Sequence, residues 1–325
     1  MNGKLKRISA LLFAATLRGS LLFFMQVFAR TEQAPPDIRL FSSNIAPSLV
    51  HWADDNSLII TEQTKLLRYD LESRKSVTLC SFDSLITDFS IRNPDEFYVA
   101  TEDPSSFTVY ECTKAGDQNI VLSLPRTDSS GIVLGKKHAC LYSISEIGNP
   151  NEIATTIRMI GLEEEPIDQS FLTTLTLIPI LCGFPIITST PFPLVPSLYT
   201  WSSPDVNPKM ISITDAESIN AIVTRDSIIG IQQQNTVTLI NTDSNSVNVV
   251  FTLGNENNLW TIINDNTLAV LSQDGRSMAV KNDEKEKNYI LPMRGIPFSS
   301  FEANLKGTDF SLVDTSGTLW ILQIE

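Results

Sequence analysis

A segment of about 40 residues recurs seven times along this chain, and each copy is a short β-branched run, a polar turn and a second β-rich run. The first runs of the copies are Leu58–Ile60, Phe97–Val99, Ala139–Leu141, Pro185–Ile187, Ser227–Ile229, Leu268–Val270 and Phe310–Leu312. Partner runs such as Leu66–Tyr69 and Thr236–Leu239 follow them. Strand repeats of this length are typical of β-propellers. We therefore predict an all-β fold, a seven-bladed β-propeller.

A circular fold must leave no strand edge open, because unpaired edges invite aggregation. The last repeat ends at its second strand, Thr318–Ile324, and so lacks a strand. The segment Asp37–Ser42, before the first repeat, is a candidate for the missing one. We expect the N- and C-terminal strands to pair in the last blade. The predicted domains are an N-terminal apolar and basic segment, 1–36, and the propeller, 37–325.

Local turn signals support this reading in most repeats. The first repeat reads as three consecutive strands, and Asp274-Gly275 is a strong tight-turn signal in the sixth. The fourth repeat is crowded with proline, which removes ladder donors and restricts strands to edges or bulges. Its run Thr190–Pro196 is apolar yet cannot be a central strand. We expect either a loop packed over the blades or an exposed apolar docking loop.

The balance of charge limits the class of partner. The formal net charge is −13, and 42% of the residues are hydrophobic, as in an ordinary globular core. An excess of carboxylates disfavours phosphate backbones, so no nucleic-acid binding is expected. The acidic surface is then either a solvated face that aids solubility or a docking face for a basic peptide. Protein or peptide partners fit this composition.

Cysteine and histidine are too sparse for a metal centre. The four cysteines are Cys80, Cys112, Cys140 and Cys182, with no Cys-x-x-Cys pair, and the two histidines are His51 and His138. Zinc sites need closely spaced ligands, so we expect no metal and no cofactor. The thiols fit small buried side chains in strands, although disulfides between adjacent blades remain an alternative.

No catalytic constellation stands out. Neither a Gly-x-Ser-x-Gly elbow nor a glycine-rich phosphate loop occurs. Both histidines are expected to be structural. The run Asp314–Trp320 approaches the Asp-box of sialidase propellers, but its spacing is one residue too long, so we read it as a hairpin turn. The charged run Asn282–Lys287 reads as a solvated loop. We predict that the chain is not an enzyme.

The N-terminal segment has several readings. Lys4, Lys6 and Arg7 precede an apolar run, and Val27–Ala29 could be a cleavage site, as in a signal peptide. Arg18 interrupts the run, at a cost to insertion. The segment lacks acidic residues before Glu32, as a mitochondrial transit peptide would. A disordered extension is a further reading of this segment. The chain is therefore expected to be cytoplasmic or nuclear, organellar, or exported or membrane-anchored through residues 1–29; membrane contact is expected only through this segment, if it is retained.

The second strand of each repeat ends where WD-repeat proteins carry a Trp-Asp dipeptide. The dipeptides there are Tyr69-Asp70, Tyr110-Glu111, Trp201-Ser202, Ile240-Asn241, Lys281-Asn282 and Leu322-Gln323. The chain thus resembles a divergent WD-repeat propeller. That resemblance implies a protein-interaction scaffold that binds partners on a propeller face or rim.

A narrower resemblance lies before the first repeat. The segment Ser48–Leu58, Ser-Leu-Val-His-Trp-Ala-Asp-Asp-Asn-Ser-Leu, is similar to the Asn-Leu-Val-Asp-Trp-Ser-x-x-Asn-x-Leu segment of fizzy-type activators of the anaphase-promoting complex. This resemblance implies a substrate-recognition subunit of a ubiquitin ligase. A third hypothesis, based on the N-terminal segment, is an exported envelope propeller with a ligand-binding or enzymatic role.

Two surfaces are candidates for partner binding. One is the apolar loop of Phe192, Leu194 and Val195, since exposed apolar patches mark interaction sites. The other is an acidic rim of Glu163, Glu164 and Glu165, which would speed encounter with basic partners.

Overall fold

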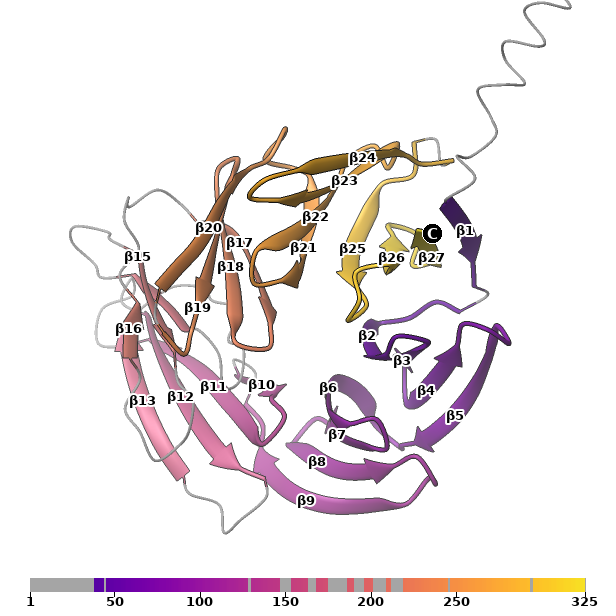
Figure 1. Cartoon of the computed structure of the whole chain (residues 1–325). Helices are drawn as coiled ribbons and strands as arrows, with labels where there is room; N and C mark the ends of the chain where they lie inside the picture. Colours follow the sequence, from indigo (N-terminus) through magenta and orange to yellow (C-terminus); the bar gives the residue numbers. More distant parts are fainter. Residues whose placement is uncertain are drawn as a thin grey trace, which may run out of the picture.

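The computed structural model describes residues 38–43, 45–127, 130–146, 153–162, 168–174, 186–189, 196–200, 209–211, 219–244, 246–292 and 295–324. Within these residues the regular elements are all β-strands, gathered into small antiparallel sheets. The sheets are arranged radially around a common centre, with one strand of each nearest the middle (Figure 1). This arrangement is a β-propeller, so the predicted fold class is confirmed.

Five sheets consist of four strands consecutive in sequence. The first two blades are β2 (Leu49–Asp54), β3 (Ser57–Glu62), β4 (Lys65–Asp70) and β5 (Lys75–Ser81), then β6 (Leu85–Asn93), β7 (Glu96–Glu102), β8 (Ser106–Thr113) and β9 (Gln118–Pro125). The others are β10 (Ser130–Leu134), β11 (His138–Glu146), β12 (Ile153–Gly161) and β13 (Asp168–Thr174); β17 (Ile219–Arg225), β18 (Ile228–Gln233), β19 (Thr236–Asn241) and β20 (Ser246–Thr252); and β21 (Leu259–Asn264), β22 (Thr267–Leu271), β23 (Ser277–Asn282) and β24 (Glu286–Ile290).

A sixth four-stranded sheet joins the two ends of the described chain. Its strands are β25 (Phe298–Ala303), β26 (Asp309–Asp314), β27 (Leu319–Ile324) and, outermost, β1 (Ile38–Ser42). The pairing is antiparallel, with Ile38 opposite Ile324 and Ser42 opposite Trp320. The segment before the first repeat therefore supplies the strand that the last repeat lacks, as expected.

The proline-rich repeat is less complete. It contains a three-stranded sheet of β14 (Ile186–Ser189), β15 (Pro196–Thr200) and β16 (Lys209–Ile211). Pro196 begins β15, a position that proline tolerates because its missing N–H then lies at the strand end. The described residues thus form six complete blades, where seven were expected.

Burial explains why the repeat was visible in the sequence. The second strand of a blade lies between two neighbouring sheets, and in β3, β7 and β18 its side chains are buried on both faces. A strand buried on both faces reads as a continuous apolar run. The first run of every repeat marks this strand, or β14 in the incomplete sheet.

Polar side chains close the turns between strands. At the end of the first strand, Asp54, Asn93 and Asn264 each accept a hydrogen bond from the backbone N–H two residues later. These Asx turns fix a tight reversal locally. The Asp274-Gly275 turn is present as predicted, with Gly275 at φ +66° and Asp274 accepting from the Arg276 N–H.

The hairpin reading of Asp314–Trp320 is also confirmed. Asp314 Oδ1 accepts hydrogen bonds from the backbone N–H groups of Ser316 and Thr318. Its Oδ2 accepts from Trp320 Nε1 at 2.8 Å. Both oxygens of the carboxylate thus accept hydrogen bonds within the β26–β27 hairpin.

The segment 1–36 lies outside the described residues. Among the residues that are described, no helix is long and apolar enough to cross a bilayer.

Candidate functional site: the central pocket

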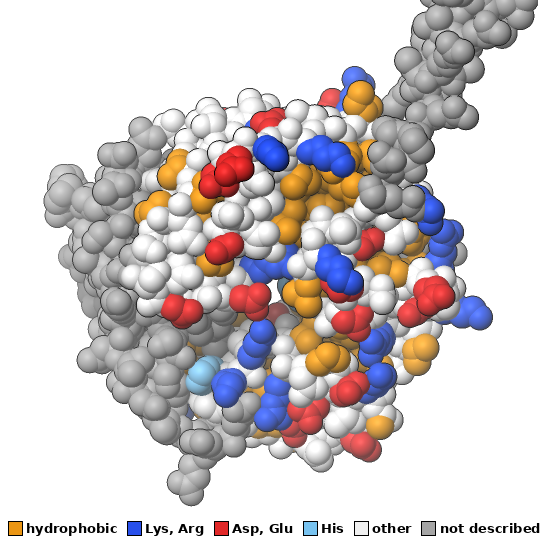
Figure 2. All heavy atoms as spheres, in the orientation of Figure 1, with side chains coloured by type: hydrophobic (Ala, Val, Ile, Leu, Met, Phe, Trp, Pro, Cys, Tyr) orange, Lys and Arg blue, Asp and Glu red, His pale blue; other side chains and the backbone are white. Residues whose placement is uncertain are grey.

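The first strands of the blades surround a central pocket of about 620 Å³. Its walls come from β2, β6, β17, β21 and β25, and Lys136, in the β10–β11 turn, completes the lining. Figure 2 shows a hollow at the centre of one face, with side chains of both charges around it. The volume is within the range of small-molecule sites, large enough for a few side chains of a partner.

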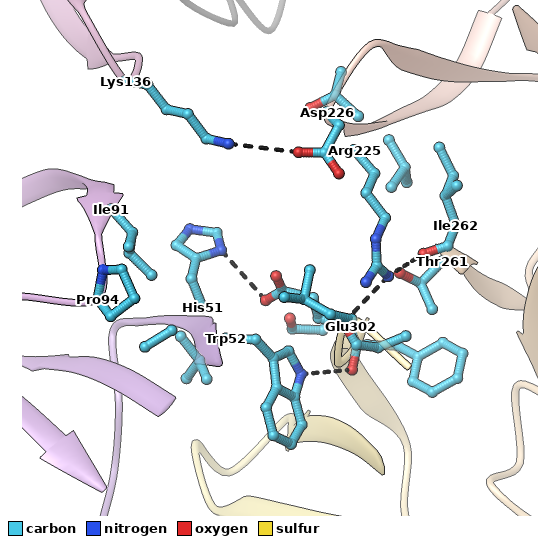
Figure 3. Close-up of a pocket in the computed structure, with 18 of the residues that line it drawn as sticks. His51, Trp52, Ile91, Pro94, Lys136, Arg225, Asp226, Thr261, Ile262 and Glu302 are labelled. Atoms are coloured by element: carbon cyan, nitrogen blue, oxygen red, sulfur yellow. Dashed lines mark hydrogen bonds and ion pairs between the residues drawn. The ribbon is translucent and has the colours of Figure 1, made fainter. Parts of the chain in front are cut away.

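The side chains of His51 and Glu302 point toward each other at the wall of the pocket (Figure 3). His51, on β2, places Nδ1 3.3 Å from Oε2 of Glu302, on β25. The imidazole is 47% exposed, and its exposed part lies inside the pocket, where the walls of the protein enclose it. Burial disfavours its charged form, but the carboxylates of Glu302 and Asp88 outweigh burial, so the pKa of His51 is raised. His51 thus joins two blades.

Asp88 connects the next two blades beside His51. Its Oδ2 accepts a 2.6 Å hydrogen bond from the N–H of Leu134 on β10, and its Oδ1 accepts from the N–H of Phe89. Burial raises the pKa of Asp88 to about 6, although these hydrogen bonds and His51 act in the opposite direction. Phe89 also contacts the His51 ring, at 5.0 Å between centroids.

Arg225, at the end of β17, ties three blades together. Its Nη1 donates to the carbonyl of Ile262 at 2.6 Å and to that of Ala303 at 3.4 Å, and Nη2 donates to the carbonyl of Asn304 at 2.6 Å. Burial lowers the pKa of Arg225, while Glu302 and nearby aspartates oppose this. The planar guanidinium suits such a junction, because its donors diverge in a fixed geometry.

An exposed ion pair lies at the mouth of the pocket. Lys136 Nζ is 3.4 Å from Asp226 Oδ1, and both side chains are about two-thirds exposed. Lys136 belongs to the β10–β13 blade and Asp226 to the β17–β20 blade, so the pair links these two blades (Figure 3). An exposed pair of this kind contributes little to stability, so both groups can exchange partners at low cost.

The seam between the β2–β5 blade and the blade of β25–β27 and β1 has further bonds. Trp52 Nε1 donates to the carbonyl of Glu302 at 3.2 Å. Lys306 pairs with Asp55 at 2.9 Å, and Asn304, which is fully buried, donates to the Asp55 carbonyl at 3.5 Å. The segment with the fizzy-type resemblance therefore forms β2 and half of this seam.

The predicted partner-binding residues Phe192, Leu194, Val195, Glu163, Glu164 and Glu165 all lie outside the described residues. His138 begins β11, as expected for a residue heading a strand. The loop Asn282–Lys287 falls at the β23–β24 turn, where its side chains are mostly exposed, as expected for a solvated loop.

Three cysteines are buried, Cys80, Cys112 and Cys140, which confirms for them the expectation of small buried side chains. Cys182 lies outside the described residues. Cys80 and Cys112 belong to one core cluster between adjacent blades. The contact with Cys80, together with burial, raises the pKa of the Cys112 thiol. Among the described residues, no group of three or more metal-ligating side chains gathers.

Sequence reasoning missed the pocket because it missed most of the first strands. Three of them, β6, β17 and β25, are only partly buried, so they lack the continuous apolar run of the second strands. A usable signal was present all the same. Asp54, Asn93, Asn264 and Asn304 each precede a second strand by a few residues, and this polar residue marks the end of a pocket-lining strand.

Known folds match this architecture. One match is a chain in the crystal structure of the Mitotic Checkpoint Complex, with a TM-score of 0.55 and 10% identity over 90% of this chain and 93% of that one. Another is the crystal structure of the WD40 β-propeller domain of Doa1, with a TM-score of 0.54 and 10% identity over 90% of this chain and 97% of that one. The fold is that of the WD40 propellers. At this identity the likeness concerns the fold alone.

No protein-family model matches the sequence, and no curated protein matches it either.

The Asp position of the WD dipeptide has a local use here. Asp70 Oδ1 accepts from the N–H of Ser73, Asn241 Oδ1 from those of Asp243 and Ser244, and Asn282 Oδ1 from that of Lys285. In three blades this position therefore caps the turn between the third and fourth strands.

Proposed function

We propose that this chain is a non-catalytic protein-interaction scaffold of WD-repeat type, which binds a partner protein or peptide on the propeller face where the central pocket opens. The observation that carries the proposal is the construction of the pocket. His51 and Arg225 are already bound to neighbouring blades, so the walls are preorganised. A preorganised surface loses little conformational entropy on binding.

The mouth of the pocket supplies adjustable charges. Lys136 and Asp226 are exposed and weakly paired, so a partner can replace either one by its own charged group. Charged rim residues mainly set the association rate and the choice of partner. A partner segment with both an acidic and a basic side chain fits this mouth.

The test compares proteins captured by the wild-type chain with those captured by the variants Lys136→Glu and Asp226→Lys. We expect each charge-reversal variant to lose a defined set of captured proteins. The double variant should recover part of this set, because it restores an ion pair between the two positions. Arg276→Glu is the matched control, since Arg276 pairs with Asp274 in the β22–β23 turn and does not line the pocket. Equal loss with Arg276→Glu would contradict the proposal, as would a hydrolase activity that His51→Ala abolishes.

We also propose that the propeller domain spans 37–325 and is a ring of seven blades. The three-stranded sheet β14–β16 stands in chain order where the remaining blade belongs, which supports this count. The pairing of β1 with β27 supports closure of the ring through the last blade. An experimental density map in which β14–β16 gains no fourth strand would contradict the seven-bladed ring.

Two further surfaces remain part of the proposal, the loop of Phe192, Leu194 and Val195 and the rim of Glu163, Glu164 and Glu165. If the loop docks a partner, Phe192→Ala weakens capture and leaves the melting temperature nearly unchanged. If the melting temperature falls steeply instead, Phe192 belongs to the core.

A second candidate is recognition of degradation signals, as in the fizzy-type activators. The resemblance over Ser48–Leu58 favours it, together with the fold shared with a chain of the Mitotic Checkpoint Complex. A degradation-signal peptide that binds wild-type chain and competes with captured partners would support this candidate. Absence of such binding would leave the general scaffold.

A further inference from the structure

Strand β20, the outermost strand of its blade, has an exposed edge with unusual side chains. It pairs with β19 on one side only. Val247 and Val250 are 59% and 57% exposed, and no other outermost strand whose side chains the structure describes has two large hydrophobic side chains that open to solvent. An edge of this kind offers backbone N–H and C=O groups together with apolar contacts.

A β-bulge places both valines on one face. Val247 lies opposite Ile240 and Val250 lies opposite Thr238, while Asn248 is the extra residue of the bulge. Directly opposite residues of an antiparallel pair point to the same face of the sheet. Val247 and Val250 therefore share a face although they are three positions apart.

The other face of β20 meets a groove. Phe251 packs against the β21–β24 blade, and a cavity of about 320 Å³ lies beside it. The lining is Val250–Thr252 on one side and Lys281–Glu286, the β23–β24 turn, on the other. Lys281 Nζ is 3.4 Å from the Thr252 carbonyl and 3.0 Å from Glu286, which fixes the turn against β20.

Hydrogen bonds hold the β23–β24 turn in place, and two carboxylates of this turn remain exposed. Asn282 Oδ1 accepts from the N–H groups of Glu284 and Lys285, at 3.1 and 2.6 Å. Asp283 and Glu284 are exposed, and within the described part of the chain neither is in an ion pair. The groove therefore has a preformed wall with two carboxylates that face solvent.

We propose that β20 binds an extended segment of a partner protein whose apolar and basic residues alternate. The segment adds a strand to the β20 edge. Its apolar side chains cover Val247 and Val250 on one face, and its lysines or arginines reach Asp283 and Glu284 on the other. The period-two alternation follows from the geometry of a strand, in which successive side chains point to opposite faces. The net charge of −13 favours the encounter.

This site is distinct from the central pocket, so it goes beyond the proposed function. The probe is a short fluorescent peptide of alternating valine and lysine. Its control is a peptide of the same composition with the valines and lysines in separate blocks. We expect the alternating peptide to bind more tightly, measured by fluorescence anisotropy at about 0.15 M salt, where long-range charge effects are screened.

Two variants test the two faces separately. Val250→Lys and the double variant Asp283→Asn with Glu284→Gln should each weaken binding about tenfold or more. Val77→Lys is the matched control, because Val77 is 64% exposed on the outermost strand β5. It should bind the peptide as the wild type does. All these side chains are exposed, so the melting temperatures of the variants should stay close to that of the wild type. If Val250→Lys has a lower melting temperature, the binding result of the double variant Asp283→Asn with Glu284→Gln tests the proposal instead.

Hydrogen exchange shows which strand binds the peptide. Binding should protect amides of β20 and leave the other outermost strands unchanged. Equal loss of binding in Val77→Lys, equal affinity for the block peptide, protection elsewhere, or no binding at all would each overturn the proposal. So would a dimer of the free chain that Val250→Lys dissolves, because the edge would then belong to a second copy.

Discussion

At the scale of single residues, the pocket owes its shape to side chains that cross from one blade to the next. His51, Trp52 and Arg225 each bond to an acceptor on another sheet. Trp52 and Arg225 donate to backbone carbonyls of neighbouring sheets. These polar side chains therefore help to set the spacing of the inner strands.

The His51–Glu302 contact predicts a titration that can be measured directly. NMR should give His51 a pKa above 6.5 in the wild type, and Glu302→Gln should lower it, because burial then acts with less opposition. The chain has two histidines, so His138→Gln assigns the signals. An unchanged His51 pKa in Glu302→Gln would contradict the contact.

The same shift fixes the sign of a pH effect on stability. A histidine whose pKa is raised in the folded state stabilises the fold below its unfolded pKa, and this contribution is lost as the pH rises through the folded pKa. Glu302→Gln should therefore cost more stability at about pH 6 than at about pH 8. The difference should be about 1 kcal/mol or less, since His51 is half-exposed.

Arg225 should be far more costly to replace. Arg225→Met removes the donors from three carbonyls at once, and we expect a loss of about 2 kcal/mol in the free energy of unfolding. Arg225→Lys keeps the charge but lacks the fork, so it should recover only part. Urea unfolding measures both, and a loss under about 0.5 kcal/mol in Arg225→Met would contradict the junction.

At the scale of elements, neighbouring blades are packed so closely that one position requires glycine. A Cβ at Gly230, on β18, would lie 2.6 Å from the ring of Trp260 on β21. Trp260 cannot easily move, because its Nε1 donates to Gln232 at 2.7 Å in a buried site. The close approach of β18 to β21 therefore depends on the absence of a side chain.

Gly230→Ala should accordingly destabilise the protein by about 2 kcal/mol through overpacking. Gly161→Ala, on β12, is the control, since a Cβ there meets nothing within 4 Å. It should stay within about 0.5 kcal/mol of wild type. Thermal unfolding of the two variants decides, and similar losses in both would contradict the packing explanation.

The elements also show what the sequence could and could not reveal. Second strands such as Leu58–Ile60 were visible because burial on both faces forces an apolar run. First strands such as Ile219–Arg225 were not, because one face packs and the other faces the pocket. The His51–Glu302 and Arg225 contacts join residues far apart in the chain, and no local pattern encodes such pairs.

At the scale of the whole molecule, one sheet unites the two ends of the chain. Strand β1 adds only backbone pairing and a few apolar side chains, yet it covers the edge of β27. Without it that edge would be open to other chains.

Proline substitutions test this role of β1. On an outermost strand, every second backbone N–H points toward the neighbouring strand and the others point outward. Leu40 and Phe41 are adjacent on β1. One of the variants Leu40→Pro and Phe41→Pro must therefore remove a hydrogen bond between β1 and β27, while the other removes an N–H that points outward. We expect the first kind to lower the melting temperature and to promote self-association, seen by light scattering. Leu40→Thr controls for the side chain. If neither proline has an effect, β1 is dispensable.

The pairing of Ile38 with Ile324 also has a consequence for synthesis in the cell. Strand β1 is made before the strands of all the other blades, and its partner β27 is made after them. At about 5–20 residues per second, the edge of β1 waits for tens of seconds before its partner emerges. Inner blades can assemble from neighbouring segments during that time, but the last sheet cannot. In a nascent chain of this design, the edge of β1 therefore stays open to other chains until the last sheet forms.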